Sequence, residues 1–223
     1  RGAGTGLAGQ AVGMGIVLDF TRHMNRIRGI SPSSVDVEPG IVLNDLNDRL
    51  LPHNKFFPVD PVSGRLCTIG GMTSTNAAGP HGVKYGSMKD HVESLTVVLS
   101  NGDLARITAP SGNHKEESPS LENIRTRLKE TLIPNRAEIL KAFPKVAKNS
   151  SGYNLKDAVA SDELDLRKII VGSEGTLAIV VEATLRLAVP PKSRIGAVAS
   201  FSSYESAVEA TLTALTTDPA AIE

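Results

Sequence analysis

Short runs of apolar residues, separated by polar stretches, recur along the first quarter of the chain. Branched and aromatic residues gather in residues 15–20 and 34–38, which predicts two short strands. Residues 42–50 carry apolar side chains at every fourth position, which predicts a helix that ends at Pro52. The pattern therefore mixes strands with helices from the beginning.

The middle of the chain contains a predicted hairpin. Residues 95–99 and 104–107 are apolar runs on either side of Asn101-Gly102, a pair suited to a type I′ turn. Residues 109–119 are polar and contain glycine and proline, which predicts an exposed connector.

Two helices are predicted after this connector. The first covers residues 121–132, where leucines and an isoleucine lie on one face. The second begins at Asn135, with Glu138 at the spacing of a capping box, and ends at Pro144.

The last third of the chain returns to strands. Residues 169–171 and 177–187 predict two strands joined by a glycine-containing loop, and Pro190-Pro191 marks a boundary. Beyond that boundary, a strand is predicted over residues 197–201 and a helix over residues 205–215.

The composition excludes several classes of protein. Hydrophobic residues make up 40% and charged residues 22% of the chain, as in ordinary globular domains. The 24 basic and 24 acidic side chains cancel, so no basic surface for nucleic acid is expected. No apolar run reaches the length of a membrane span. The single cysteine, Cys67, cannot form an internal disulfide and is compatible with a reducing compartment.

Candidate chemistry begins with the opening RGAGTGLAG, which places four glycines in nine residues. Residues 4–9 match the G-x-G-x-x-G dinucleotide fingerprint, but a strand-like run follows where that fingerprint requires a helix. A P-loop is excluded because no Gly-Lys-Ser/Thr closes the segment. Amides unshielded by Cβ atoms can still form a nest for a diphosphate. The alternative is a glycine-rich turn that binds nothing.

Three further segments are equally bare. They are residues 68–79, 82–91 and 172–176, and each combines glycine with small hydroxyl or amide side chains. Such loops let a ligand lie close to the backbone and offer it many hydrogen-bond donors. We therefore predict that the loops converge on one extended ligand.

The order of these motifs resembles a known family. RGAGTGLAG, DPVSGRLCTIGGMTSTNAAG, YGSMKDHVESLTVVLSNGD, KNSSGYNL and VGSEGTLAIVVEATLRL are together similar to the FAD-binding domain of the vanillyl-alcohol oxidase and p-cresol methylhydroxylase type (PCMH-type, FAD-linked oxidase). Within that group the chain looks closest to the glycolate oxidase and D-lactate dehydrogenase branch. The resemblance implies an α+β, two-subdomain flavin fold over residues 1–190 that lacks its first strands and helix. Residues 191–223 would then begin a truncated C-terminal substrate (cap) domain.

The resemblance also assigns residues to the cofactor. The first loop would bind the FAD pyrophosphate, and the second, with Pro61, would line the ribityl chain and the flavin ring. The third would continue the pocket, and the fourth would lie along the adenosine end. The implied contacts are Gly2, Ala3, Gly4, Thr5, Gly6, Leu7, Pro61, Gly70, Gly71, Thr75, Asn76, Gly79, Gly86, Asp90, Val92, Glu174, Gly175 and Ile179. The first loop contains no histidine, so non-covalent FAD is expected.

Other reactive side chains have less specific interpretations. Lys148, in KNSSGYNL, is a candidate catalytic group that would place positive charge near the flavin, and a solvent-facing lysine is the equal alternative. His81 and His91 lack partners at metal-ligand spacing and are interpreted as structural, so no metal site is predicted. Cys67 is interpreted as a small packed residue at the edge of the flavin loop.

The reaction implied by the resemblance is oxidation of a 2-hydroxy acid such as D-lactate or glycolate, with hydride transfer to flavin N5. The electron acceptor would be a quinone, a cytochrome or an iron–sulfur partner, and an iron–sulfur cluster is expected in a C-terminal part. The implied location is cytoplasmic, with peripheral attachment at the inner membrane face as a variant. This fragment alone is expected to be inactive. The alternatives are an oxidase that uses O₂ on an alcohol or aldehyde, and a nucleotide-binding module without catalysis.

Overall fold

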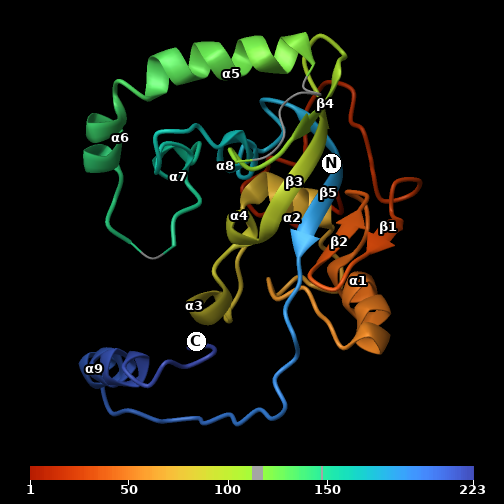
Figure 1. Ribbon diagram of the computed structural model, residues 1–223. Coiled ribbons are helices and arrows are strands. Elements are labelled where there is room, and N and C mark those ends of the chain that lie inside the picture. Colours follow the sequence, from red (N-terminus) through yellow and green to blue (C-terminus); the bar gives the residue numbers. More distant parts are fainter. Residues whose placement is uncertain (112–117, 147) are drawn as a thin grey trace.

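The computed structural model describes residues 1–111, 118–146 and 148–223, and it is built around an antiparallel sheet. The sheet has five strands in the order β1-β2-β5-β3-β4, and each neighbouring pair is antiparallel. The strands are β1 (Ile27–Ile30), β2 (Ser34–Val37), β3 (Val92–Val98), β4 (Leu104–Ile107) and β5 (Ile179–Arg186). β5 lies at the centre of the sheet, although it is the last of the five strands in the sequence (Figure 1).

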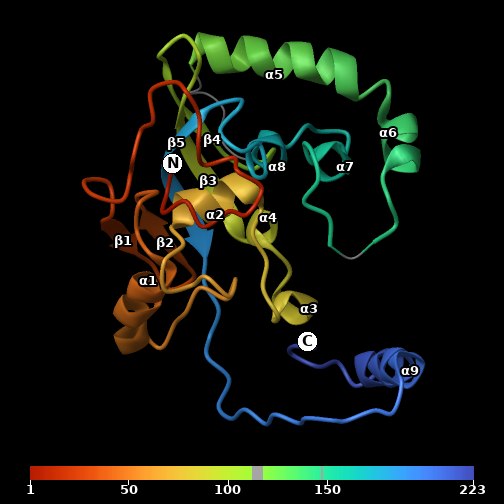
Figure 2. The ribbon, with the colours of Figure 1, turned by 180° about the vertical axis from the view of Figure 1, so that it is seen from behind.

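Helices surround this sheet (Figure 1). They are α1 (Leu43–Leu50), the 3-10 helix η1 (Leu51–His53), α2 (Ile69–Thr75), α3 (Gly82–Tyr85), α4 (Met88–His91), α5 (Pro119–Leu132), α6 (Arg136–Ala142), α7 (Leu155–Ala158), α8 (Leu166–Ile170) and α9 (Tyr204–Leu215). Seen from behind, α2 crosses the face of the sheet, with α1 on one side of it and α5 to α8 on the other (Figure 2).

The core lies between the sheet and the helices that cover it. In α1 the side chains of Leu43, Leu46 and Leu50 are at most 2% exposed, because a spacing of three and four residues places them on one face. In β3 the side chains of Leu95 and Val97 are fully buried, as expected for residues two apart on one face of a strand. The spacing of apolar residues that predicted these elements therefore also determines which side chains are buried in the core.

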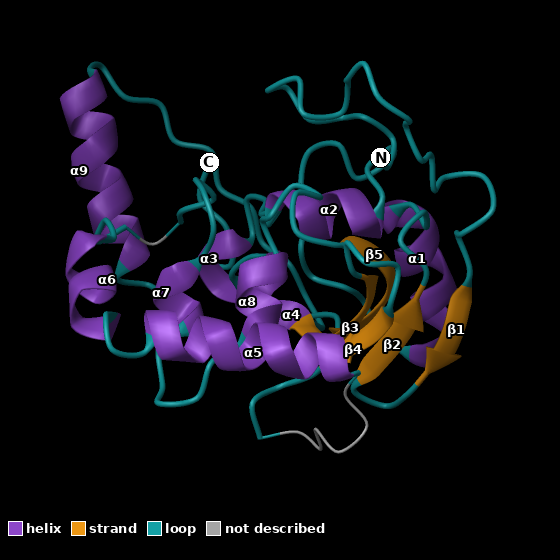
Figure 3. Cartoon of the chain, turned by 90° about the horizontal axis from the view of Figure 1, so that it is seen from above, coloured by secondary structure: helices purple, strands orange, loops and turns teal. Residues whose placement is uncertain are grey.

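The C-terminal segment lies apart from this core. An extended stretch follows β5, and α9 then stands away from the sheet (Figures 1 and 3). Its apolar side chains are open to solvent, with Val208 59% and Leu212 62% exposed.

Several predicted elements are confirmed. They are the strand at 34–38, the helix at 42–50, the antiparallel hairpin of β3 and β4, the helices α5 and α6, the strand β5 and the helix α9. The predicted connector at 109–119 falls largely on residues 112–117, which lie outside the described residues.

Three predicted strands are wrong. Residues 15–20 and 197–201 form no strand in the described chain, because a run of branched residues needs a neighbouring strand to complete its hydrogen bonds and neither run has one. Residues 169–171 instead lie at the end of α8, which Asp165 begins by accepting a hydrogen bond from the Arg167 amide at 3.1 Å. A three-residue apolar run cannot distinguish a buried strand from a buried helical turn.

Two local predictions also need correction. Of the Asn101-Gly102 pair only Gly102 has a positive φ, +88°, whereas a type I′ turn requires two such residues. The loop instead closes between Leu99 and Asp103, whose N–H and carbonyl groups bond at 2.9 Å. The capping box at Asn135 does not form, because its Nδ2 donates backward to the Thr131 carbonyl at 2.8 Å.

Candidate cofactor-binding site

The short helix α2 forms one wall of a large cavity. It begins at Thr68, whose Oγ1 accepts a hydrogen bond from the Gly71 amide at 3.3 Å, and it ends at Asn76 in the left-handed conformation with φ 48°. Gly70 faces Pro39 so closely that a Cβ there would lie 2.5 Å from the Pro39 Cβ. Gly70 therefore lets α2 pack tightly against Pro39, while small residues such as Gly71 and Thr75 face the cavity.

The first glycine loop lies against the start of α2. A Cβ on Gly2 would lie 2.1 Å from Thr68 Oγ1, so only glycine allows this approach. Within the described residues, the main-chain amides of residues 2–7 donate no hydrogen bond. These amides are therefore free to donate to a ligand, as an anion nest requires.

The fourth loop reaches the opposite end of α2. The amides of Gly172 and Glu174 donate to the carbonyls of Thr73 and Ser74, both at 2.9 Å. Glu174 adopts a left-handed φ of 54°, and its side chain is exposed at the cavity. Two main-chain bonds thus fix a loop that lies a hundred residues away from α2 in the sequence.

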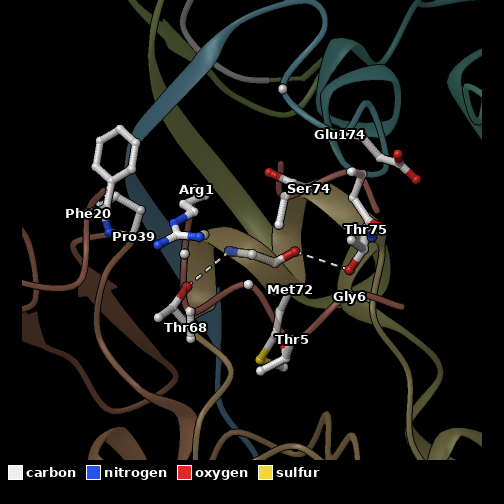
Figure 4. Close-up of a pocket in the computed structure, with 18 of the residues that line it drawn as sticks. Arg1, Thr5, Gly6, Phe20, Pro39, Thr68, Met72, Ser74, Thr75 and Glu174 are labelled. Atoms are coloured by element: carbon white, nitrogen blue, oxygen red, sulfur yellow. Dashed lines mark hydrogen bonds between the residues drawn. The ribbon is translucent and has the colours of Figure 1, made fainter. Parts of the chain in front are cut away.

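These segments enclose a cavity of about 610 Å³, within the ~300–1,000 Å³ typical of ligand sites. Figure 4 shows its labelled residues spread along α2, with Arg1, Phe20 and Pro39 on one side of the view and Glu174 on the other. The volume is large enough for an extended ligand.

Most of the sequence-predicted cofactor residues line this cavity. They are Gly2, Ala3, Gly4, Thr5, Gly6, Pro61, Gly70, Gly71, Thr75, Glu174, Gly175 and Ile179. The first, second and fourth glycine segments therefore do converge in space.

The remaining predicted residues do not line the cavity. Leu7 is fully exposed, and the others are Asn76, Gly79, Gly86, Asp90 and Val92. Asn76 is 3% exposed and its Oδ1 accepts from the Lys89 amide at 3.0 Å, while Asp90 accepts from the Ser87 amide at 2.8 Å in a capping box. These two residues hold the segment between α2 and β3 in place.

Lys148 also lies outside the lining. Its side chain is exposed on the segment between α6 and α7. His81 and His91 are likewise absent from the lining; His81 Nδ1 pairs with Asp60 Oδ2 at 2.5 Å, and His91 Nε2 donates to the Tyr85 carbonyl at 2.7 Å. None of these three candidate reactive side chains therefore contributes to the cavity surface.

Sequence reasoning missed other lining residues. Arg1, Pro39, Thr68, Met72 and Ser74 contribute, as do Gln10 and most of the residues that follow it up to Phe20. Thr68, Met72 and Ser74 lie within the predicted segment 68–79, but the sequence did not mark these side chains themselves. Residues 10–20 gave no signal, because their position depends on how residues 1–20 fold back on themselves. Arg1 shows this, since its Nε lies 3.4 Å from Asp19 Oδ2.

Cys67 forms part of the cavity lining. Its side chain is 5% exposed, and burial raises the pKa of its thiol above the ordinary value. The protonated thiol is a poor nucleophile. The interpretation of Cys67 as a small packed residue at the edge of this loop agrees with its place in the core.

The residues present fit FAD. The free amides of residues 2–7 suit its diphosphate, and glycines that a Cβ would crowd suit close approach of a planar ring. The antiparallel sheet and the helix that crosses it define an α+β protein, and its cavity has the size and the free amides that an extended anionic ligand would need.

Comparison with known protein families shows which ligand this class of protein binds. Residues 1–108 match the family described as FAD binding domain. The resemblance to FAD-binding domains recognised in the motifs is therefore confirmed for this part of the chain.

Several curated proteins are similar over nearly the whole chain. The D-2-hydroxyglutarate dehydrogenase of Escherichia coli (strain K12) is 36% identical over 93% of this chain and 21% of its own length. The D-lactate dehydrogenase of Anaerostipes hadrus is 31% identical over 93% and 34%. The glycolate oxidase subunit GlcD of Bacillus subtilis (strain 168) is 31% identical over 94% and 35%. The chain thus spans between about a fifth and a third of these relatives.

A solved structure confirms the fold. An alkyldihydroxyacetonephosphate synthase superposes with a TM-score of 0.56 at 19% identity, covering 86% of this chain and 29% of that protein. The likeness supports the α+β fold with its antiparallel sheet.

Proposed function

We propose that this chain is the flavin-binding part of an oxidoreductase that oxidises a 2-hydroxy acid, and that it binds FAD without a covalent bond. The observation that carries the proposal is that residues 1–6, most of residues 68–75, and residues 174–175 line one cavity. When bound, FAD supplies a ring that accepts a hydride from a substrate carbon.

The residues of this chain contribute binding and orientation. The amides of residues 2–6 would hold the diphosphate, while the bare face of α2 at Gly71 and Thr75 would lie along the ribityl chain and the ring. The Glu174 carboxylate would accept hydrogen bonds from ribose hydroxyls. No histidine is among the described lining residues, which supports dissociable FAD.

The substrate class rests on the relatives. Proteins named for D-2-hydroxyglutarate, D-lactate and glycolate all match this chain, and these compounds share a hydroxyl beside a carboxylate. We propose a 2-hydroxy acid of that kind. The proposed electron acceptor is a quinone, a cytochrome or an iron–sulfur partner, with any iron–sulfur cluster outside these residues. No helix among the described residues is long and apolar enough to cross a membrane.

A larger side chain in the cavity wall tests the proposed site directly. Gly71 lines the cavity, and a Cβ there would meet only Thr68 Oγ1, at 3.4 Å. We therefore expect Gly71→Leu to fold normally but to lose FAD binding in calorimetry. Gly196→Leu, at a position with nothing within 4 Å and outside the lining, is the matched control. Equal FAD affinity of the two variants would refute the proposed site.

The substrate class needs a second test. In the longest native polypeptide that carries this sequence, anaerobic addition of D-2-hydroxyglutarate, D-lactate or glycolate should bleach the flavin absorbance. If simple alcohols or aldehydes reduce the flavin and none of the three acids does, the alternative of an alcohol or aldehyde oxidase is favoured over a 2-hydroxy-acid dehydrogenase.

A further inference from the structure

The fourth glycine loop holds Glu174 in a backbone conformation that side chains rarely adopt. Glu174 has a φ of 54°, and its neighbours Gly172 and Gly175 have φ values of 92° and 76°. Glycine reaches this left-handed region freely, whereas a residue with a Cβ stays there only where its surroundings hold it. The Glu174 carboxylate lines the cavity and has no hydrogen bond or ion pair within the described residues (Figure 4). The contacts that hold the loop therefore decide where this free carboxylate lies.

Two hydroxyl groups support the loop in sequence. The Thr176 hydroxyl lies 2.6 Å from the carbonyl oxygen of Ser173, the residue before Glu174, and donates its only hydrogen there. The Tyr153 hydroxyl lies 2.8 Å from Thr176 Oγ1. Because the Thr176 hydrogen is already used, Tyr153 is the donor of this second bond. The bonds therefore run from Tyr153 through Thr176 to the backbone beside Glu174, and bonds in such a chain strengthen one another.

This tyrosine belongs to the motif KNSSGYNL, which lies outside the cofactor cavity. None of residues 148–154 lines that cavity, but most of them enclose a second, small pocket together with Gly172. The motif and the fourth loop therefore lie side by side. Asn154 anchors the motif, because its Nδ2 donates to Asp157 Oδ2 at 2.9 Å and the same carboxylate pairs with Lys89 of α4. The tyrosine thus reaches the loop from a segment that is fixed to another part of the fold.

We propose that Tyr153 and Thr176 are positioning residues, which hold the fourth loop so that the Glu174 carboxylate lies at the cavity. Neither Tyr153 nor Thr176 lines the cavity, so both act through Glu174. The inference rests on the proposed function and deepens it, since it assigns a role to the motif KNSSGYNL through Tyr153 in place of Lys148.

Calorimetry of FAD binding to the longest native polypeptide that carries this sequence tests the proposal. Tyr153→Phe removes only the hydroxyl of a side chain that is 42% exposed, so the fold should be unaffected. We expect FAD to bind about 2- to 10-fold more weakly, the range for the loss of one hydrogen bond. Tyr204→Phe is the matched control, because Tyr204 is 90% exposed on α9 and outside the lining, and it should leave the affinity unchanged.

Substitutions at Thr176 test the chain of bonds itself. Thr176→Val removes both hydrogen bonds and should weaken FAD binding at least as much as Tyr153→Phe does. Thr176→Ser keeps the hydroxyl and should recover most of that loss. Adding Tyr153→Phe to Thr176→Val should have no further effect, because the bond that it removes is already lost.

A second pair of substitutions connects these hydroxyls with Glu174. Glu174→Gly removes the carboxylate, and glycine adopts the left-handed conformation without strain. We expect Tyr153→Phe to weaken FAD binding much less in this variant than in the wild type, since no carboxylate is left to position. Without FAD, the urea unfolding midpoint should be the same for Tyr153→Phe and Tyr204→Phe.

The outcomes separate this inference from the proposed function. If the wild type binds FAD but Tyr153→Phe binds it as tightly as Tyr204→Phe does, the inference is refuted while the flavin site stands. The inference is also refuted if Tyr153→Phe costs as much affinity in Glu174→Gly as in the wild type, or if it lowers the urea midpoint, because the tyrosine would then support the fold and not the carboxylate. If the wild type does not bind FAD, the proposed function itself is wrong.

Discussion

The two walls of the cavity are both rich in glycine, yet their glycines have different physical roles. In the glycine segment that contains α2, residues 68–79, Gly70 and Gly79 lie against neighbouring backbone. Gly79 is outside the cavity lining, and a Cβ on it would lie 2.1 Å from the Asp60 carbonyl oxygen. In the segment that follows the first loop, Gly9, Gly13 and Gly15 have nothing within 4 Å. Gly70 and Gly79 allow two segments of backbone to pack closely, whereas Gly9, Gly13 and Gly15 leave the main chain exposed.

The difference extends to the surrounding side chains. Ile69 and Met72 of α2 are at most 2% exposed, whereas Met14 and Ile16 are more than 90% exposed. Glycine in a sequence therefore does not reveal by itself whether it serves the fold or the ligand. The contrast predicts that substitutions at the crowded glycines, Gly70 and Gly79, change stability, and that substitutions in residues 9–20 scarcely do.

The largest effect is expected at Gly79. Gly79→Ala places a methyl group against the main chain of Asp60, and backbone cannot move aside as a side chain end would. We expect the free energy of unfolding to fall by about 1–3 kcal/mol, as in other overpacked sites. Urea denaturation followed by circular dichroism measures the change. An unchanged midpoint would mean that the two walls do not differ in packing.

A smaller loss is expected from Thr68→Ala. Thr68 is 1% exposed and caps α2 through the Gly71 amide, so its removal should cost about 1 kcal/mol of global stability. Ser203 caps α9 in the same way, by accepting from the Ser206 amide at 3.2 Å. Because α9 stands apart from the core, Ser203→Ala should lower helix content slightly and leave the unfolding midpoint unchanged. Equal midpoint shifts would contradict this view of α9.

Gly13→Ala should act in the opposite direction. Gly13 has no positive φ and open space around it, so alanine there restricts mainly the unfolded chain. We expect a gain between zero and about 1 kcal/mol in the same urea experiment. A loss comparable to that of Gly79→Ala would show that the segment up to residue 20 is packed as tightly as α2.

The smallest expected effect is on the reactivity of Cys67 and is measured on the unsubstituted protein. Burial raises the pKa of the Cys67 thiol, so at any pH below that value the thiolate fraction is smaller than in an exposed cysteine. Its reaction with a disulfide reagent should be slower at pH 8 than that of an exposed cysteine, and should accelerate as the pH rises. Added FAD should slow it further, because Cys67 lines the cavity. A rate equal to that of free cysteine would mean that the α2 wall opens readily.

Periodicity explains which elements were predictable. The helix α1 and the hairpin of β3 and β4 follow from residues spaced for one buried face, and local spacing is written in the sequence. Residues 169–171 were misassigned because three apolar residues carry no period. Residues 15–20 were misassigned because strand formation depends on a partner elsewhere in the chain.

The sequence by itself determined where the chain has glycine-rich segments, and the order of these motifs was enough to recognise the resemblance to FAD-binding domains. Twelve of the eighteen residues assigned to the cofactor in this way line the cavity. Only the tertiary structure decided which bare segments meet, since the bonds from Gly172 and Glu174 to α2 join loops a hundred residues apart. It also brought in Arg1 and Gln10, and it placed Asn76 and Asp90 outside the lining. The physical reason is that glycine removes a side chain locally, whereas a binding surface forms only where distant segments pack together.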